Sequence, residues 1–320
     1  MSKPQKPRRP AIDNRPSGKP STHSRRPTRP TPDAQWDEEE NQGLEKLQKV
    51  AGLQAVKALF RRSPERVIRL YYSNELRKEA GPLCSELAKL HRPYRLLEEE
   101  ELIKVSGTQL HGGIVAAVTP REVPPIDFHE LGHWAKTRKP LIILDGIGNP
   151  NNLGAIARTM AYFGLEHLLL SDHPEQSNLS DSAYRVAEGG LEYLKIARVS
   201  NLPSALLSVR QYYRVIGTAL SPTAKTLEAL APDRRRPIAL VLGNEQVGLG
   251  KAVLAACEAV ITIPGHGHIQ SLNVAATAAI LIHQLSAKAE NRSTSAKKPT
   301  LPKTKSLKKH DAPHIRSRNS

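Results

Sequence analysis

Short apolar runs and stretches of helical periodicity alternate along residues 44–118. Apolar side chains recur at helical spacing in Leu53, Val56 and Leu59, and a β-branched and aromatic run at 67–72 follows. The pattern further predicts a helix at 83–90, a strand at 94–97 and a Gly-marked turn into a strand at 111–118. Strands and helices of this length indicate a small α/β domain.

A more regular alternation begins at Leu141. The run 141–144 is entirely apolar, which is typical of a strand buried on both faces of a sheet. A helix at 153–163 places Leu153, Ile156 and Met160 on one stripe. Further strands are predicted at 167–170, 215–219, 238–242 and 260–263, with helices between them, followed by a last, Ala-rich helix at 271–286. This order predicts an α/β fold with an open, mostly parallel sheet.

The net charge of +16 is concentrated at the two ends of the chain. Residues 1–35 hold eight prolines and nine Lys/Arg against two Asp, and residues 291–320 hold nine Lys/Arg against one Asp. Such segments bury too little apolar surface to offset their ordering entropy, so we expect both to be disordered. Cationic arms suit phosphate binding. Solubility tails without a dedicated partner are the alternative.

These patterns divide the chain into five parts. We expect a disordered basic tail at 1–42, a small domain at 43–118, a linker at 119–138, the second α/β domain at 139–288 and a second disordered basic tail at 289–320. The acidic run at 37–40 is interpreted as part of a solvated connection.

Cysteine usage and hydropathy restrict the class of protein further. Cys84 and Cys257 lie far apart with no His cluster beside them, which argues against a disulfide framework or a zinc site. The Pro- and Arg-rich start lacks the apolar stretch of a secretory signal, and the apolar run at 273–285 is too short to span a bilayer. We therefore expect a soluble, cytoplasmic protein with no metal and no membrane partner.

Three loops follow predicted strands and could bind a ligand, since ligands of open α/β sheets bind at the carboxyl ends of the strands. The first, at 145–158, is rich in Gly and Asn; Asn152 is expected to cap the following helix, and Arg158 lies about a turn and a half into it. An ordinary capped turn with a surface arginine is the alternative. In the second, at 243–250, glycines allow close approach of backbone to a ligand, yet Glu245 would repel a pyrophosphate.

A third loop, at 263–274, precedes the last helix, which Ser271 or Asn273 could cap. His266 and His268 have no Cys or acidic residue beside them, so a metal site is disfavoured. A polar loop with exposed amides suits an adenosyl ligand better.

Taken in order, the three loops resemble motifs of the SpoU (TrmH) family of RNA 2'-O-ribose methyltransferases. The matching residues are 149–155 with Arg158, 242–245 through 248–249, and 263–264 through 271–274. Residues 185–190 resemble a further stretch of the family, and residues 52–118 resemble its L30e-like N-terminal substrate-binding domain. The resemblance covers about 43–288.

The resemblance implies a SPOUT-type, mostly parallel sheet with a C-terminal trefoil knot, and a homodimer whose active site draws on both subunits. It implies S-adenosyl-L-methionine as cofactor and no metal. By position, the cofactor would be bound by Thr218, Ala219, Gly243, Ile263 and Leu272. The polar catalytic cluster would be Asn152, Arg158, Glu245, Ser271 and Asn273.

The residue types fit the implied chemistry. Methyl transfer from a sulfonium is an in-line displacement, so most of the catalysis is alignment. The family's arginine is often assigned as general base, but a guanidinium with a pKa above about 12 is a poor base near neutrality. We expect Arg158 to bind phosphate and stabilise the developing alkoxide, with Ser271, Asn273 or water relaying the proton.

Two positions depart from the family pattern. Asn149 stands where the first motif usually has Asp, and Gly265 stands where the third usually has a large apolar residue. These departures indicate an atypical subgroup. We expect methyl transfer to a ribose 2'-hydroxyl of rRNA or tRNA; the alternative is an RNA-binding or ribosome-associated protein that keeps the knotted fold with little catalytic activity.

Overall fold

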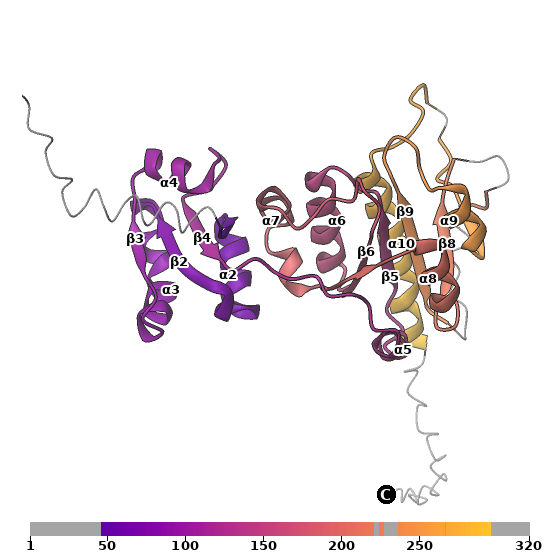
Figure 1. Cartoon of the computed structure of the whole chain (residues 1–320), viewed down its shortest axis with the longest axis horizontal. Helices are drawn as coiled ribbons and strands as arrows, with labels where there is room; N and C mark the ends of the chain where they lie inside the picture. The colour runs from indigo at the N-terminus through magenta and orange to yellow at the C-terminus, as the bar shows by residue number, and fades with distance from the viewer. Residues whose placement is uncertain (1–45, 221–223, 227–235, 266, 296–320) are drawn as a thin grey trace, which may run out of the picture. The chain divides into compact units, whose positions relative to one another are not determined.

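The computed structural model describes residues 46–220, 224–226, 236–265 and 267–295, coloured in Figure 1. The expected N-terminal tail lies outside the described residues. The last helix runs to Ser295, past residue 288 at which the second domain was expected to end, and the rest of the C-terminal tail lies outside the described residues.

The N-terminal part of the described chain is a small sheet with helices on both faces. Its strands are β1 (Gln48–Ala51), β2 (Val67–Tyr72), β3 (Tyr94–Leu96) and β4 (Ile114–Val118), in the order β1-β4-β2-β3. Its helices are α2 (Leu53–Arg62), α3 (Arg77–Lys89) and α4 (Glu99–Ser106), with 3₁₀ turns η1 (Pro64–Arg66) and η2 (Asn74–Leu76). Alternate residues of β4 enter separate cores, with Ala116 packed toward α2 and α3 and Val115 toward α4. Because both faces of β4 are buried, all five of its residues are apolar.

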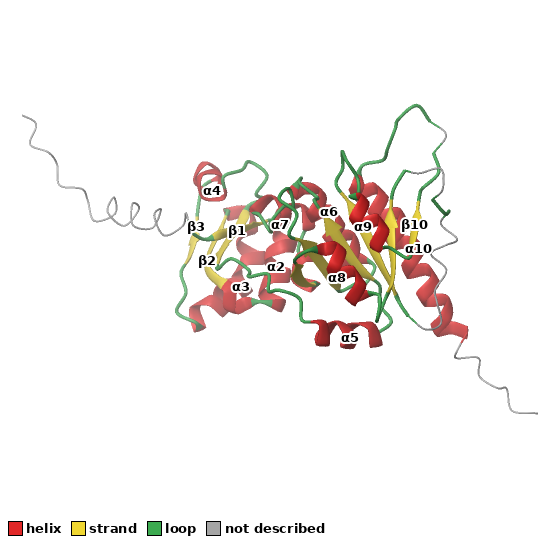
Figure 2. Cartoon of the chain, turned by 45° about the vertical axis from the view of Figure 1, so that its right-hand side comes forward, coloured by secondary structure: helices red, strands yellow, loops and turns green. Residues whose placement is uncertain are grey.

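The second part is a parallel six-stranded sheet in the order β10-β8-β9-β5-β6-β7. The strands are β5 (Leu141–Asp145), β6 (His167–Ser171), β7 (Lys195–Val199), β8 (Arg214–Thr218), β9 (Ile238–Gly243) and β10 (Ala259–Ile261). Helices cover both faces, as Figure 2 shows. The predicted α/β fold class is confirmed, and the trefoil knot stays a prediction.

Alternation along the strands separates the two helical layers. Ile142 and Leu144 face the layer of α6 (Pro150–Tyr162), α7 (Asp181–Ala187) and α10 (Val274–Ser295). Leu141 and Ile143 face the layer of α5 (Phe128–Lys136), α8 (Leu202–Val209) and α9 (Lys251–Ala256). Burial on both faces selects the all-apolar strands that the sequence displays.

The predicted pattern lacked strands β1 and β7 and helices α4 and α5. Helix α5 lies inside the segment 119–138 that was expected to be a linker, and it buries Leu131 and Trp134 against the sheet. Asp127 caps it by accepting a hydrogen bond of 2.8 Å from the backbone N–H of His129. The large apolar residues of this nine-residue helix, Phe128, Leu131 and Trp134, form too short a stripe to distinguish it from a connector by pattern alone. In the described part of the chain, no helix is long and apolar enough to cross a membrane.

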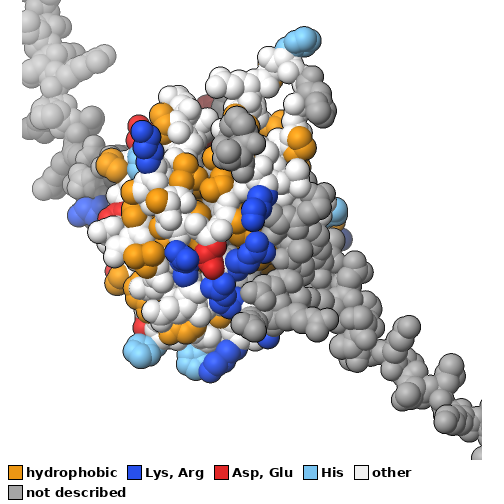
Figure 3. All heavy atoms as spheres, turned by 90° about the vertical axis from the view of Figure 1, so that its right-hand side faces the viewer, with side chains coloured by type: hydrophobic (Ala, Val, Ile, Leu, Met, Phe, Trp, Pro, Cys, Tyr) orange, Lys and Arg blue, Asp and Glu red, His pale blue; other side chains and the backbone are white. Residues whose placement is uncertain are grey.

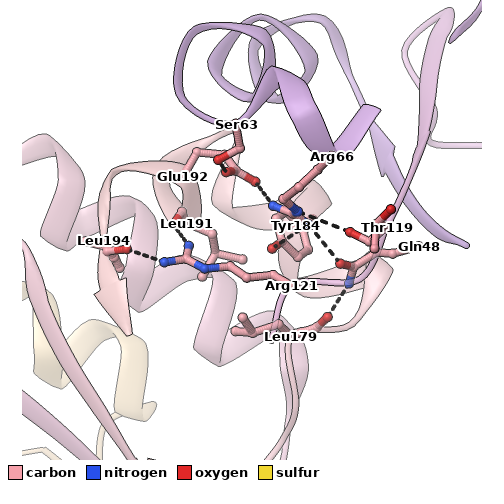
Figure 4. A network of polar contacts seen from close by, with 10 residues as sticks. All are labelled: Gln48, Ser63, Arg66, Thr119, Arg121, Leu179, Tyr184, Leu191, Glu192 and Leu194. Carbon is pink, nitrogen blue, oxygen red and sulfur yellow. Dashed lines mark hydrogen bonds and ion pairs between the residues drawn. The ribbon is translucent and has the colours of Figure 1, made fainter. Parts of the chain in front are cut away.

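A buried polar network joins the small sheet to the layer of α6 and α7 (Figure 4). Arg66 donates to Glu192 at 2.8 Å and to the Tyr184 hydroxyl at 3.3 Å, and Ser63 donates to Glu192 at 2.9 Å. Arg121, just beyond the small sheet, donates to the carbonyls of Leu191 and Leu194 at 2.7 and 2.6 Å. The network lies beside apolar contacts that are continuous between the two parts.

One buried histidine makes the stability of the fold depend on pH. His167 opens β6, is 1% exposed and stacks on Trp134 with ring centroids 4.5 Å apart. Burial lowers the pKa of His167 from 6.5 to about 4. Between these pH values the unfolded chain binds a proton that the folded chain does not, so stability falls as the pH falls.

We expect acidification from pH 7 to pH 4.5 to destabilise the protein more than its His167→Phe variant, by on the order of 2 kcal/mol. Phenylalanine keeps an aromatic ring against Trp134 and does not titrate. Urea denaturation of both proteins at the two pH values measures the difference. Identical pH dependence would show that His167 does not contribute.

Candidate active site

The first loop positions its asparagines differently from the prediction. Helix α6 is capped by Asn149, whose side chain accepts a hydrogen bond of 2.9 Å from the backbone N–H of Asn151, and Pro150 occupies the first helical position. Asn152 is therefore not the cap, as the sequence had suggested. Its side chain instead points across to the second and third loops. Asn149 thus supplies the cap acceptor that Asp would supply at this position.

Three of the five expected catalytic residues meet in one chain of hydrogen bonds. The Asn152 Nδ2 donates to Glu245 Oε1 at 2.7 Å, and the Asn273 Nδ2 donates to Asn152 Oδ1 at 3.1 Å. Asn273 Oδ1 in turn accepts from the backbone N–H of Ala275 at 2.8 Å and caps α10. Each of the three loops thus contributes one amide or carboxylate to the same cluster.

A hollow of about 690 Å³ opens beside this cluster. It is lined by Gly148, Asn149, Asn152, Glu175, Asn244, Glu245, Gln246 and Asn273. The Asn244 Nδ2 donates to Glu175 Oε2 at 2.7 Å and to the Gly146 carbonyl at 2.8 Å. Its Oδ1 accepts from the backbone N–H groups of Gln246 and Val247 at 2.8 and 3.1 Å, which shapes the second loop.

Sequence reasoning missed Glu175 as a residue of this hollow. It follows β6, which pairs with β5, so its place just beyond the carboxyl end of a neighbouring parallel strand was the available signal. With Glu245 it gives the hollow two carboxylates. Both can accept hydrogen bonds from hydroxyl or amino groups of a ligand.

Arg158 and Ser271 lie apart from the hollow. Arg158 is six residues beyond Asn152 on α6, about 9 Å along the axis and roughly 120° around it. Its Nη1 pairs with Glu188 Oε1 at 2.9 Å, and the two side chains are 56% and 49% exposed. Ser271 is exposed on the loop before α10. Neither residue lines the hollow.

Three of the expected cofactor residues, Thr218, Ala219 and Gly243, lie at the carboxyl ends of β8 and β9. Thr218 donates its hydroxyl to the Val241 carbonyl at 3.1 Å, and the Ala219 N–H donates to the Ile261 carbonyl at 3.1 Å. Gly243 ends β9 where a Cβ would lie 2.6 Å from the backbone of Gly248, so only glycine allows the second loop to fold back this closely.

The remaining two residues belong to the third loop. Ile263 packs partly against the core, whereas Leu272 is 53% exposed. An added Cβ at Gly265 would meet nothing within 4 Å. His266 lies outside the described residues, and among those described no group of three or more His, Cys, Asp or Glu side chains could hold a metal ion.

Comparison with known proteins assigns both parts of the chain. Residues 139–283 match the SpoU rRNA Methylase family, and residues 49–124 match the RNA 2'-O ribose methyltransferase substrate binding domain. The 23S rRNA (guanosine-2'-O-)-methyltransferase RlmB of Photorhabdus laumondii is 30% identical over 239 residues, which are 73% of this chain and 96% of the relative. The protein of the same name from Acinetobacter baylyi is 29% identical over 241 residues, 73% of this chain and 94% of the relative.

Solved structures share the fold. An rRNA methyltransferase from Sinorhizobium meliloti has a TM-score of 0.62 at 19% identity, covering 78% of this chain and 90% of that one. The SpoU methyltransferase AviRb from Streptomyces viridochromogenes has a TM-score of 0.59 at 20% identity, covering 79% and 93%.

The fold, the loops and these matches define an S-adenosylmethionine-dependent RNA 2'-O-ribose methyltransferase with its own substrate-binding domain. The chain belongs to the SpoU rRNA methylase family. The family, reaction and cofactor expected from the three motifs are thereby confirmed.

Proposed function

We propose that this protein methylates a ribose 2'-hydroxyl of 23S rRNA. The observation that supports it most is the chain of hydrogen bonds from Glu245 through Asn152 to Asn273, which unites the three loops beside the hollow. The relatives that align over almost their whole length are named as 23S rRNA guanosine 2'-O-methyltransferases, which favours 23S rRNA over tRNA.

The described residues fit S-adenosylmethionine, whose bound form supplies an electrophilic methyl group on sulfur. Large apolar side chains are exposed on the loops after β8, β9 and β10, including Leu220 at 62%, Val247 at 77% and Leu272 at 53%. Exposed apolar side chains beside a tight glycine turn suit a planar adenine held by backbone groups. In this proposal Thr218, Ala219, Gly243, Ile263 and Leu272 hold the adenosyl group.

The polar cluster orients the ribose. Asn152, Glu245 and Asn273 are fixed by one another, so they can hold a ribose hydroxyl without rearranging. Ser271, Asn273 or water passes on the proton that the 2'-hydroxyl loses. Arg158 binds the neighbouring phosphate and stabilises the developing alkoxide, because a guanidinium donates several hydrogen bonds and keeps its charge.

A homodimer would account for the position of Arg158 outside the hollow of its own subunit. Tyr162, at the end of α6, is 83% exposed, and Ile280 on α10 is 38% exposed. Phe163 and His283 join these two helices edge to face, with ring centroids 5.7 Å apart. Exposed apolar side chains on adjacent helices favour a second copy there, with a site shared between subunits. Sedimentation equilibrium should give twice the chain mass of 35.2 kDa; a monomer would contradict the proposal.

In this proposal the protein acts in the cytoplasm. Its two basic tails bind RNA and hold it near the folded domains. Nine Lys/Arg in each tail would release counterions from RNA phosphates. Part of the described surface is also basic: Figure 3 shows Lys and Arg side chains gathered around an acidic one, on the face that holds α8, α9 and β8 in Figure 1. RNA binding should therefore weaken steeply with salt.

The test is transfer of labelled methyl groups from S-adenosylmethionine to 23S rRNA, 16S rRNA and tRNA by the full chain, followed by mapping of 2'-O-methylated positions. We expect a single ribose in 23S rRNA to be labelled. Labelling of tRNA alone would overturn the choice of RNA. No labelling and no binding of S-adenosylmethionine would favour the RNA-binding alternative with little activity.

A further inference from the structure

The carboxylate that pairs with Arg158 sits on an unfavourable backbone conformation. Glu188 ends α7 with φ +44° and ψ +44°, the left-handed region that side chains other than Gly, Asn and Asp seldom adopt. Glycine would adopt it without cost, and the two residues that follow are both glycine. The chain thus keeps a glutamate where backbone geometry favours glycine, and its Oε1 lies 2.9 Å from the Arg158 Nη1.

The turn that contains Glu188 packs against two elements: helix α6, which carries Arg158, and helix α2 of the small domain. A Cβ on Gly190 would lie 2.9 Å from the Arg158 Cα and 3.0 Å from the Ala157 carbonyl of α6. A Cβ on Gly189 would lie 2.5 Å from the Ala58 Cβ of α2. The backbone beside Glu188 therefore contacts the backbone of Arg158 on one side and the substrate-binding domain on the other.

A buried ion pair secures the same segment. Glu192, in the turn η3 (Gly190–Tyr193), accepts from Arg66 of the small domain at 2.8 Å, with the two side chains 1% and 12% exposed. Figure 4 shows this contact among the other polar contacts of the segment. The position of the 188–192 segment thus depends on how the small domain is docked.

We propose that Glu188 is a positioning residue for Arg158, placed by the docked substrate-binding domain; this rests on the role of Arg158 in the proposed function. A guanidinium has five N–H donors, and Glu188 engages Nη1 while leaving the others for an RNA phosphate. Holding the long arginine side chain in one conformation removes freedom that would otherwise be lost when substrate binds. Arg158 is thus oriented before RNA arrives.

Two substitutions separate this role from a structural one. Glu188→Gly removes the carboxylate and also the energetic cost of a side chain in the left-handed region. Glu188→Gln removes only the negative charge. We expect Glu188→Gly to melt at the same or a higher temperature than the native protein, yet to lower kcat for RNA methylation about tenfold with KM for S-adenosylmethionine unchanged. Glu188→Gln keeps an oxygen acceptor, so its kcat should lie between that of the native protein and that of Glu188→Gly. A structural role would make activity follow thermal stability.

The matched control is Glu166→Gln. Glu166 is 43% exposed, similar to Glu188, and pairs with Lys139 before β5 and β6, at the end of the sheet away from the three loops. This variant should leave kcat unchanged. In a double-mutant cycle, Glu188→Gly should cost little further activity once Arg158 is replaced by alanine. If the native protein methylates RNA and Arg158→Ala lowers kcat but Glu188→Gly does not, the proposal is overturned while the proposed function stands. If the native protein transfers no methyl group, the proposed function itself fails.

Discussion

Replacing Arg158 by lysine is expected to lower kcat for methyl transfer to RNA about a hundredfold, close to 2.7 kcal/mol of transition-state stabilisation. Lysine keeps the positive charge but loses the planar fork of donors that binds an anion on one edge while another stays engaged. Arg158 uses Nη1 for Glu188 at 2.9 Å, so its remaining donors are those that can meet phosphate or a developing alkoxide. A single ammonium cannot replace both sets at the same positions.

Single-turnover methylation with saturating S-adenosylmethionine measures this loss directly, because product release does not contribute. Binding of S-adenosylmethionine, measured by calorimetry, is the internal control and should be unchanged, since the expected cofactor residues lie after β8, β9 and β10 rather than on α6. Unchanged kcat in Arg158→Lys would remove Arg158 from the catalytic machinery.

Replacing Arg66 by methionine is expected to destabilise the protein by about 3 kcal/mol. The Glu192 side chain is 1% exposed, and without the guanidinium its carboxylate would keep only the Ser63 hydroxyl, at 2.9 Å, among the side-chain partners that the structure describes. The Tyr184 hydroxyl and the Gln48 amide would lose a donor at the same time. A buried charge left without its partner costs far more than the intact pair contributes.

Guanidinium or urea denaturation gives the free energies of unfolding. The matched control is Lys139→Met, which breaks the Lys139–Glu166 pair, 40% and 43% exposed, and should cost less than about 1 kcal/mol. The double variant Arg66→Met/Glu192→Gln should regain part of the loss, because a neutral amide is less costly to bury. Equal, small losses in Arg66→Met and Lys139→Met would contradict a buried docking pair.

Most strands of the six-stranded sheet could be predicted because burial on both faces requires consecutive apolar residues, a pattern that is visible in the sequence. Runs such as 141–144 must be apolar in a parallel sheet covered by two helical layers, and the predicted strands agree with β5, β6, β8, β9 and β10 to within a few residues. The edge strand β7 and the helix α5 escaped prediction. Strand β7 includes Lys195 and Arg198, and α5 has a short apolar stripe, so neither differs enough from a loop in local pattern.

By itself, the sequence determined the α/β class, the positions along the chain of β5, β6, β8, β9 and β10, and the three loops whose residues identify the family. Those loops could be expected to meet because parallel strands bring their carboxyl ends to one edge of a sheet. Only the tertiary structure decided which side chains form hydrogen bonds and ion pairs with one another. It selected Asn149 rather than Asn152 as the cap of α6, joined Asn152 to Glu245 and Asn273, brought Glu175 to the hollow and paired Arg66 with Glu192.

The physical reason is the range of each interaction. Caps, periodicity and apolar runs depend on neighbours within a few residues, so they are written in the local pattern. The Asn152–Glu245 and Arg66–Glu192 contacts join residues 93 and 126 positions apart, and they exist only once the helical layers have packed. Glu188 depends on both local and long-range interactions. The two glycines that follow it indicate a turn in the sequence, but its contact with Arg158 depends on how α7 packs against α6.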